Sequence, residues 1–464
     1  MRQAVLGLLA LTVLRLVLAA YLPMAPDEDY YFLWAQHLQA GYFDHPPMVA
    51  LWIKASTALI GNTPFGIRLF GPLAAALGSV LLWDAAEQLA PGRGIIAAAL
   101  LNATLLIGAG AIIITPDTPL LFFWTAGLAA CARLISSGNP RWWLAVGLAA
   151  GCMLLSKYTA PLFIAAVFLW LVTRAEGRRQ LATPWPWAGT VLALLIFSPN
   201  IAWNAGHHWV SFLKQGGRVA GFDPVRAAQF FGELVGSQIG LGTPVIVALA
   251  ALGLWRLRHD AAPGARLVLW LAVVPGAVLL EHVLSDRVQP NWVAILYPVA
   301  CLAAAMLPAA RLARWLKPAL GVGFAFTAIA YVQALAAPVP VPAALDTVSQ
   351  QLAGWHAVAR TAMAGHPVFV TSSDYATMSV LAVDGPPGVI VAAFPNKWDW
   401  RWSYFGYKPA VPRGTFGIMV TKDPKMPCPD LLGTLTRSRG SERFTHYRLC
   451  GYVATESGVA LPRP

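Results

Sequence analysis

A series of apolar runs, each about twenty residues long, is the feature of this sequence that most limits how it can fold. A helix of about twenty apolar residues is long enough to cross the hydrocarbon core of a bilayer. Runs of roughly this length cover residues 4–22, 65–89, 94–112, 119–136, 142–156, 159–173, 187–203, 238–255, 266–283, 291–308 and 318–336. The first run has no small-residue cleavage site before Pro23, so we expect an uncleaved span rather than a secretory signal. The runs predict an α-helical polytopic membrane protein with about eleven transmembrane helices.

The low charge content supports a lipid environment for most of the chain. Of the 464 residues, 57% are hydrophobic and only 12% are charged, whereas soluble domains carry about 25% charged residues. So few ionic groups could not cover a water-facing surface. The net charge of +12 does not indicate nucleic-acid binding, because many of the basic residues lie in short connections between apolar runs.

The distribution of charge predicts the orientation of the spans. If the N-terminus lies inside, the inner loops carry Arg93, Arg141, Arg174, Arg178, Arg179, Arg256, Arg258, Arg266, Arg311, Arg314 and Lys317. The outer loops then carry Asp27, Glu28, Asp29, Asp44 and Asp117 with fewer cations. This is the positive-inside pattern, and an odd number of spans places the C-terminal tail outside.

The composition changes after residue 337. Pro338, Pro340 and Pro342 form a linker, and residues 338–464 mix helical and strand patterns, which predicts a small soluble α/β domain. We expect a helix over 348–364 and strands over 367–371, 388–393 and 415–421. Cys428 and Cys450 could pair if this domain lies in an oxidising compartment. Three tryptophans either stack on sugar rings, anchor the domain on the membrane or pack in its core: Trp398, Trp400 and Trp402.

The first outer loop, residues 23–64, is long and aromatic and predicts two amphipathic surface helices broken at Gly41 and at Pro46-Pro47. It begins with Asp27-Glu28-Asp29. These carboxylates either cap the next helix or supply a general base at the boundary between water and lipid. Further along, Asp44 and His45 are competent metal ligands, and His45 could instead hold a phosphate; a solvated turn is the alternative.

Other polar residues gather on the same predicted outer face. Asp117 either caps the fourth span or belongs to a site. Lys157 opposes the positive-inside trend, so it either snorkels to the interface or contacts a lipid phosphate. Arg218 and Arg287 have the same two interpretations, and Trp292 could be an ordinary interface anchor.

These segments resemble those of a known family. Asp27–Trp34 and Gly41–Met48 look like the first-loop signature of the GT-C glycosyltransferases. The resemblance is greatest to the bacterial branch that contains protein-mannosyltransferase-like and lipid A aminoarabinose and galacturonic acid transferases. Further resemblance lies, in order, at Thr115–Pro119, Leu155–Thr159, Pro199–Asn204 and Pro290–Trp292. The match covers roughly residues 1–310.

The resemblance implies an inverting transfer of a sugar from a polyprenyl-phosphate (undecaprenyl-phosphate) donor to a lipid, glycan or protein acceptor. It places the chain in the bacterial inner membrane, with its active site and C-terminal domain in the periplasm. Asp27 becomes the candidate base, with Glu28 beside it. The candidate donor-phosphate ligands are His45, Lys157, Arg218 and Arg287. The candidate substrate-binding residues are Tyr30, Tyr31, Asp117, Tyr158, Asn291 and Trp292.

The sequence also departs from its relatives. Tyr30 stands where they often have an arginine near the donor phosphate, so another cation must serve. Asp44 stands where some relatives bind a divalent metal (Mg, Mn or Zn). A second long outer loop is expected over residues 204–237, but none of its histidines matches the relatives' other metal ligand, which leaves metal dependence open.

Two other classes of function compete with a transferase. A transporter or flippase would place ionisable residues near the middle of its spans and often shows two matching halves. Here most carboxylates lie in predicted outer loops and no internal repeat is visible. A non-catalytic scaffold would leave the acidic first loop unexplained. We therefore expect an enzyme that acts on a lipid-linked sugar.

Overall fold

The computed structural model describes residues 1–464 except 217–220, 340, 343–345, 395–399, 406–408, 440–441 and 462–464. Arg218 and Trp398 lie outside the described residues, as does Pro340 of the expected linker. The chain divides into two compact units. The first, called here the helical unit, comprises residues 1–17, 45–49 and 70–329. The second, called the mixed unit, comprises residues 18–44, 50–69 and 330–464.

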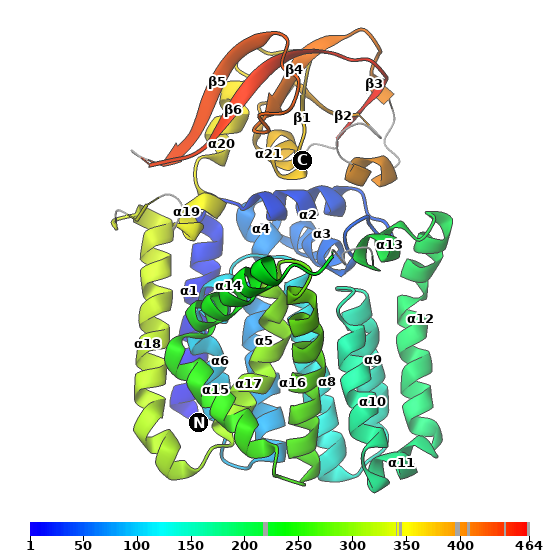
Figure 1. Ribbon diagram of the computed structural model, residues 1–464, viewed down its shortest axis with the longest axis vertical. Helices are drawn as coiled ribbons and strands as arrows, with labels where there is room; N and C mark the ends of the chain where they lie inside the picture. The colour runs from blue at the N-terminus through cyan, green and yellow to red at the C-terminus, as the bar shows by residue number, and fades with distance from the viewer. Residues whose placement is uncertain are drawn as a thin grey trace. The chain divides into compact units, whose positions relative to one another are not determined.

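The helical unit consists of helices joined by short connections (Figure 1). The helices are α5 (Phe70–Leu89), α6 (Gly94–Ala103), α7 (Leu105–Gly110), α8 (Asp117–Ser137), α9 (Trp142–Leu154), α10 (Pro161–Val172), α11 (Ala175–Leu181), α12 (Pro184–Gly206), α13 (Val210–Gly216), α14 (Pro224–Gly242), α15 (Pro244–Leu257), α16 (Pro263–Val283), η1 (Pro290–Leu296) and α17 (Tyr297–Ala305). Most of α1 (Arg2–Tyr21) and of α18 (Ala309–Ala336) also belongs to this unit.

Six helices of the described residues are long and apolar enough to cross a membrane, and a seventh is added if the bent pair α14 and α15 counts as one span. The bend of that pair is 106° and falls at Thr243, inside the expected span 238–255. The expected span 94–112 is broken at Thr104, whose extended backbone separates α6 from α7. Other expected spans correspond to shorter apolar helices, among them α9 and α10. The structure therefore supports a helical membrane protein, and the count of eleven spans stays a prediction.

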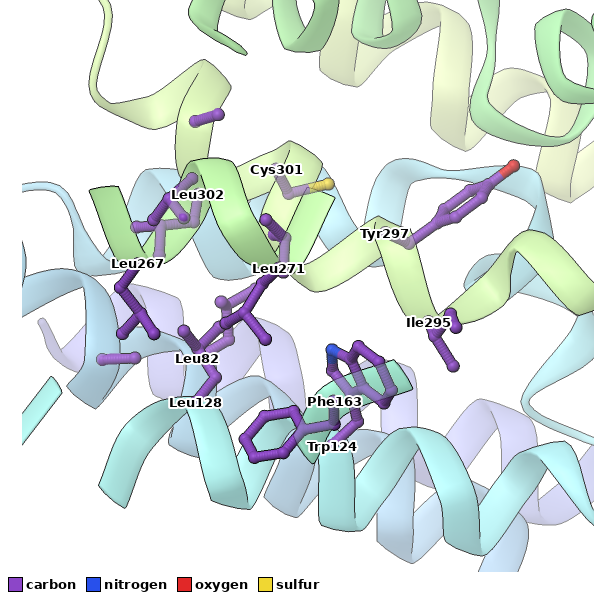
Figure 2. Packing of buried hydrophobic residues seen from close by; sticks show 14 of the residues in the cluster. Leu82, Trp124, Leu128, Phe163, Leu267, Leu271, Ile295, Tyr297, Cys301 and Leu302 are labelled. Atoms are coloured by element: carbon purple, nitrogen blue, oxygen red, sulfur yellow. The ribbon is translucent and has the colours of Figure 1, made fainter. Parts of the chain in front are cut away.

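The interior of the helical unit is a single large apolar cluster (Figure 2). Trp124 of α8 and Phe163 of α10 pack edge to face with their ring centroids 5.1 Å apart. Small residues let some helices approach closely: a side chain at Gly147 of α9 would collide with the backbone of Gly189 in α12. Such contacts are the usual way in which helices pack inside a membrane, where lipid tails are as apolar as leucine.

The mixed unit contains a seven-stranded sheet in the order β3-β7-β2-β1-β4-β6-β5. Its strands are β1 (Phe369–Ser372), β2 (Ile390–Ala393), β3 (Pro409–Val411), β4 (Phe416–Thr421), β5 (Leu431–Arg439), β6 (Glu442–Val453) and β7 (Gly458–Ala460). β1 runs parallel to β2 and β4, and the remaining pairs are antiparallel. The three expected strands are confirmed as β1, β2 and β4, and Cys428 forms a disulfide with Cys450.

Helices complete the mixed unit: α2 (Pro26–Gln36), most of α3 (Met48–Ile60), α4 (Pro64–Arg68), α19 (Thr347–Leu352), α20 (Trp355–Ala362), α21 (Tyr375–Asp384) and η2 (Trp400–Phe405). The helix expected over 348–364 is broken in two at Gly354, whose φ of 77° favours glycine. The expectation that the first helix of the loop is amphipathic is wrong. Nine of the eleven residues of α2 are buried, and α2 packs against α21.

Candidate active site

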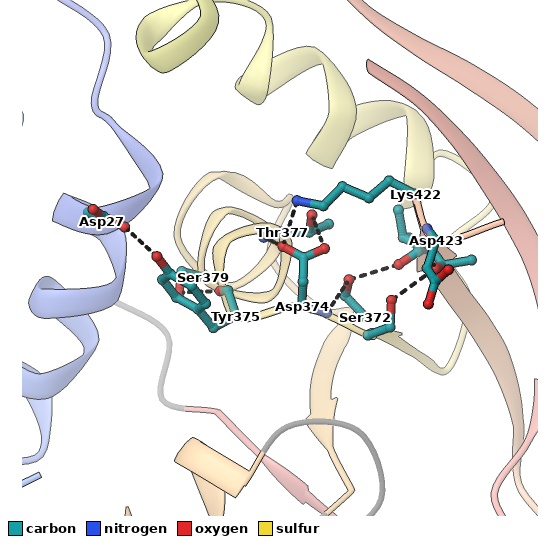
Figure 3. Close-up of polar contacts among 11 residues, drawn as sticks. Asp27, Ser372, Asp374, Tyr375, Thr377, Ser379, Lys422 and Asp423 are labelled. Carbon is teal, nitrogen blue, oxygen red and sulfur yellow. Dashed lines mark hydrogen bonds and ion pairs between the residues drawn. The ribbon is translucent and has the colours of Figure 1, made fainter. Parts of the chain in front are cut away.

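The first of the three loop carboxylates, Asp27, is half-exposed and is held by a residue from the C-terminal segment. The Tyr375 hydroxyl donates a hydrogen bond of 2.9 Å to Oδ1 of Asp27 (Figure 3). Burial and the neighbouring charge of Asp27 raise the pKa of Tyr375, so its hydroxyl stays protonated and remains a donor. Asp27 is therefore half-exposed with one oxygen fixed by a neutral partner.

The turn before α21 fixes the position of Tyr375. Asp374 is the N-cap of α21, and its Oδ1 accepts a hydrogen bond of 3.0 Å from the backbone N–H of Thr377. Its Oδ2 accepts a second bond, of 2.9 Å, from the Thr377 hydroxyl. The Ser372 hydroxyl, at the end of β1, donates to the carbonyl of Val420 in β4 at 2.8 Å (Figure 3). The tyrosine that contacts Asp27 is thus anchored to the sheet.

Asp44 is held by two donors, and one of them also comes from the C-terminal segment. Tyr30 donates its hydroxyl to Oδ2 of Asp44 at 2.9 Å, and Nε of Arg401 donates to the same oxygen at 2.8 Å. The Arg401 guanidinium also lies 4.5 Å from the centre of the Tyr375 ring. Arg401 thus brings a positive charge to the carboxylates of the first loop.

The other two loop carboxylates are buried. Both Glu28 and Arg68 are fully buried, and Nε of Arg68 donates to Oε1 of Glu28 at 2.7 Å. Arg68 also donates to the carbonyls of Leu22 and Pro23, each at 2.7 Å. Because its oxygens are committed to this ion pair, Glu28 has a structural role in the entry of the chain into α2. We expected it beside the base as a catalytic residue.

Asp29 is 1% exposed, and neither of its carboxylate oxygens has a hydrogen-bond partner among the described residues. Burial is the largest cause of a raised pKa for Asp29, followed by the charges of Asp384 on α21 and of Glu28. A carboxyl group in this setting is stabilised in its neutral form. Among the three acids, only Asp27 combines exposure with a hydrogen bond that favours its ionised form.

Tyr30 and Tyr31, expected to bind substrate, are core residues of the mixed unit. Tyr30 packs edge to face on Trp402 with centroids 5.4 Å apart, and Tyr31 packs on Trp34 at 5.1 Å. Trp402 is buried, which favours core packing among the three alternatives for this tryptophan. The hydroxyl of Tyr30 nevertheless belongs to the site through Asp44.

The helical unit contains a second polar cluster. Nζ of Lys157, a residue only 5% exposed, lies 2.6 Å from Oδ1 of Asp117. Oδ2 of Asp117 accepts a hydrogen bond of 2.7 Å from the Asn291 amide. Three of the residues selected from the sequence therefore meet, although they lie in loops far apart in the chain. The pairing explains how a lysine can be buried at this position, because its charge is compensated.

The remaining selected residues are dispersed within the helical unit. The Tyr158 hydroxyl donates to the buried Asn200 at 3.3 Å. Trp292 packs on His282 with centroids 5.5 Å apart. Arg287 forms an exposed ion pair with Glu233 at 2.6 Å, so its charge is partly compensated. His45 is half-buried.

A metal site at Asp44 does not fit the residues that surround it. No group of three or more His, Cys, Asp or Glu side chains that could hold a metal ion occurs in the described part of the chain. The carboxylate of Asp44 instead accepts bonds from an arginine and a tyrosine.

Sequence reasoning missed Tyr375, Arg401 and Arg68. Arg401 lies between Trp400 and Trp402, two of the three tryptophans that the sequence analysis considered as a sugar-binding group, so a basic residue among them was a signal. Tyr375 carries no such signal, because only the packing of α2 on α21 brings it to Asp27.

Comparisons with known proteins agree on one superfamily. The family model described as dolichyl-phosphate-mannose-protein mannosyltransferase matches residues 44–203. The lipid A galacturonosyltransferase RgtD of Rhizobium johnstonii is 26% identical over 302 residues, which are 61% of this chain and 60% of that protein. The chain thus spans about three fifths of the length of this curated relative.

The fold of the whole chain is shared with solved structures. ArnT from Cupriavidus metallidurans bound to undecaprenyl phosphate has a TM-score of 0.64 at 15% identity, with 97% of this chain and 98% of that one covered. Its apo form has a TM-score of 0.65 over the same shares. These findings confirm the resemblance and show a helical membrane fold of the GT-C type.

Proposed function

We propose, from the premise that the chain has the GT-C glycosyltransferase fold, that it transfers a sugar from a polyprenyl-phosphate donor to a hydroxyl-bearing acceptor. The observation that carries this proposal is the hydrogen bond from Tyr375 to Asp27. It orients a half-exposed carboxylate, the group that such a transfer needs as a general base.

The reaction uses Asp27 as follows. The Asp27 carboxylate accepts the proton of the acceptor hydroxyl while the hydroxyl oxygen attacks the anomeric carbon of the sugar. The bond between the anomeric carbon and the phosphate oxygen breaks, and the polyprenyl phosphate leaves with the electron pair. Attack opposite to the leaving group inverts the anomeric configuration, as in inverting glycosidases.

The leaving phosphate needs positive charge. In the mixed unit the candidate for this role is Arg401, whose guanidinium lies beside Asp44. In the helical unit the separate candidate is Lys157, which is paired with Asp117. His45, which follows Asp44 in the first loop, is a further candidate. Arg401 takes the place of the arginine that is missing at Tyr30.

An apolar groove supports a lipid-linked donor. It has a volume of about 520 Å³, lies between α9, α10 and α12, and includes Leu154 and Pro161 on either side of the loop that carries Lys157. A polyprenyl chain in this groove would bring its phosphate toward Lys157. The matched ArnT structure is bound to undecaprenyl phosphate, a lipid of this class.

The acceptor and the side of the membrane belong to the same proposal. The name of the curated relative makes galacturonic acid and lipid A the first donor sugar and acceptor to test. The positive-inside pattern supports eleven spans with the site and residues 338–464 in the periplasm of a bacterial inner membrane.

The proposal is tested by mass spectrometry of envelope lipids and glycans. Cells with the wild-type chain are compared with cells that carry Asp27→Asn at equal expression. We expect a species lighter by one sugar residue in the variant, and this species identifies both sugar and acceptor. Identical profiles at equal expression of folded protein would refute a transferase that uses Asp27.

A further inference from the structure

Another cavity lies in the helical unit, and none of the residues assigned above lines it. It has a volume of about 820 Å³ and is formed where α10 and α15 end and α16 begins. Its polar lining includes Thr173, Arg174, Glu176, Arg258, Arg266 and Trp270. These residues lie in or beside two loops about eighty positions apart in the sequence, with Glu176 in α11 and Arg266 and Trp270 in α16. Both loops are among those that the charge pattern places on the inner side.

Two indole hydrogen bonds hold the walls of this cavity together. Nε1 of Trp170 in α10 donates to the carbonyl of Pro263 at 3.0 Å, and Nε1 of Trp270 in α16 donates to the Thr173 hydroxyl at 3.2 Å. The end of α10 is therefore fixed against the start of α16 at two points. These hydrogen bonds hold in place the helix ends that carry Arg174 and Arg266.

Positive charge exceeds negative charge in this lining. Arg174 has one ion pair, 3.4 Å long, with the largely exposed Glu176. Arg258 lies 3.3 Å from the centre of the Trp255 ring and donates to His259 at 2.8 Å. Arg266 is half-buried, and its side chain makes no hydrogen bond or ion pair with the described residues. A half-buried guanidinium without a carboxylate is costly, and an anion in the cavity would compensate it.

The other wall of the cavity is apolar. Leu269 and Val273 line it from α16, a helix long and apolar enough to span a membrane. The cavity therefore joins a basic region at the helix ends to a surface of the kind that faces acyl chains. A soluble anion would contact only the basic region, whereas a phospholipid would contact the basic region with its headgroup and the apolar surface with its acyl chains.

We propose that this cavity binds the headgroup of an anionic phospholipid of the inner leaflet. The phosphate accepts hydrogen bonds from Arg266 and Arg174, and the acyl chains lie along Leu269 and Val273. Basic pockets between spans on the inner side of membranes are suited to lipids of this kind. The proposal does not depend on the sugar-transfer reaction.

The test uses the purified full-length chain and native mass spectrometry. The protein is equilibrated with equal amounts of phosphatidylglycerol and phosphatidylcholine of the same acyl composition. Arg266→Gln is the main variant, because the arginine side chain makes no hydrogen bond or ion pair with the described residues that the substitution would break. Arg311→Gln is the matched control, since Arg311 is an exposed arginine of another predicted inner loop outside the cavity.

We expect the wild type and the control to retain phosphatidylglycerol in preference to phosphatidylcholine. Arg266→Gln should weaken the retention of phosphatidylglycerol about tenfold, as expected when a charge-assisted hydrogen bond is lost. Thermal unfolding in phosphatidylcholine alone should be the same for all three proteins, which separates lipid binding from folding.

Three results would overturn the proposal. The first is equal retention of the two lipids by the wild type. The second is retention of phosphatidylglycerol by Arg266→Gln at the wild-type level. The third is displacement of phosphatidylglycerol by millimolar inorganic phosphate, which would assign the cavity to a soluble anion.

Discussion

The acidic residues of the first loop differ sharply in their surroundings although they follow one another in sequence. Asp27 is half-exposed and accepts a hydrogen bond from Tyr375, and the nearby Asp44 accepts bonds from Tyr30 and Arg401. Asp44 is buried whereas Asp27 is half-exposed, but each contacts a side chain of the C-terminal segment, and we call these two the linked pair. Glu28 and Asp29 are buried; one is neutralised by Arg68, and the other has no hydrogen-bond partner among the described residues.

Within one helical turn, Asp27 is therefore suited to catalysis, whereas the buried Glu28 and Asp29 affect the stability of the fold. A carboxylate that is to accept a proton needs access to a substrate and a setting that favours its ionised form. A carboxylate in an ion pair without exposure has neither access nor a free oxygen. Acidic residues in a row are therefore not equivalent candidates, and each has to be judged by its partners.

The largest expected effect on stability concerns the buried ion pair of Glu28 and Arg68. Glu28→Gln leaves the buried Arg68 guanidinium without its counter-ion, and we expect a loss of about 3–5 kcal/mol in the free energy of unfolding. Thermal unfolding in detergent measures this loss. In contrast, Glu233→Gln removes the exposed partner of Arg287 and should change little. Similar unfolding of both variants would show that the buried pair has no special role.

Around the linked pair, Arg401→Gln should lower the rate of transfer about a hundredfold, the size of effect seen when one donor that stabilises a developing anion is lost. The measurement is kcat and KM for the donor with purified protein. Lys157→Gln, in the helical unit, should act in the same direction. Unchanged kinetics for Arg401→Gln at full stability would remove Arg401 from the donor site.

Tyr375→Phe tests the positioning of Asp27. Loss of a hydrogen bond to a charged group should lower kcat/KM about tenfold at low pH. Because this bond favours the ionised carboxylate, the acid limb of the pH–rate profile should move to higher pH. A uniform loss at every pH would instead indicate a structural role for Tyr375.

Asp29→Asn should have the smallest effect among these substitutions. We expect the effect as a change in how the stability of the protein depends on pH. The folded pKa of Asp29 is raised above its ordinary value of 3.8 by burial, then by Asp384 and Glu28. The wild type therefore binds more protons folded than unfolded, and it loses stability as the pH rises from about 4 toward the folded pKa. The variant does not titrate here, so its unfolding temperature relative to the wild type should increase with pH. A difference that is constant with pH would contradict the raised pKa.

Much of the fold follows from the sequence. Apolar runs indicate where most of the helices lie, and alternation of side chains indicates β1, β2 and β4. The breaks at Thr104 and Gly354 were missed, because an apolar run or a helical pattern does not reveal a local backbone turn. The amphipathic character expected for the first loop helix was wrong because α2 is covered by α21, a contact between segments about 350 residues apart.

The site could be predicted only in part, for a similar reason. The family resemblance selects Asp27, and the charge pattern selects Lys157 as an exception on its face. Neither signal separates Asp27 from Glu28, because the partner Arg68 lies inside an expected span. Neither reveals Tyr375, whose role depends on the capped turn that follows β1.

The central claim is that Asp27, and not its neighbour Asp29, is the base. The most direct measurement is the initial rate of sugar transfer from a polyprenyl-phosphate donor by purified wild type, Asp27→Asn and Asp29→Asn at neutral pH. General base catalysis contributes a factor of about 10² to 10⁴. We therefore predict a loss of this size for Asp27→Asn with donor binding retained, and a rate within a few-fold of the wild type for Asp29→Asn. Normal transfer by a folded Asp27→Asn variant, or an equal loss in both variants, would contradict the account.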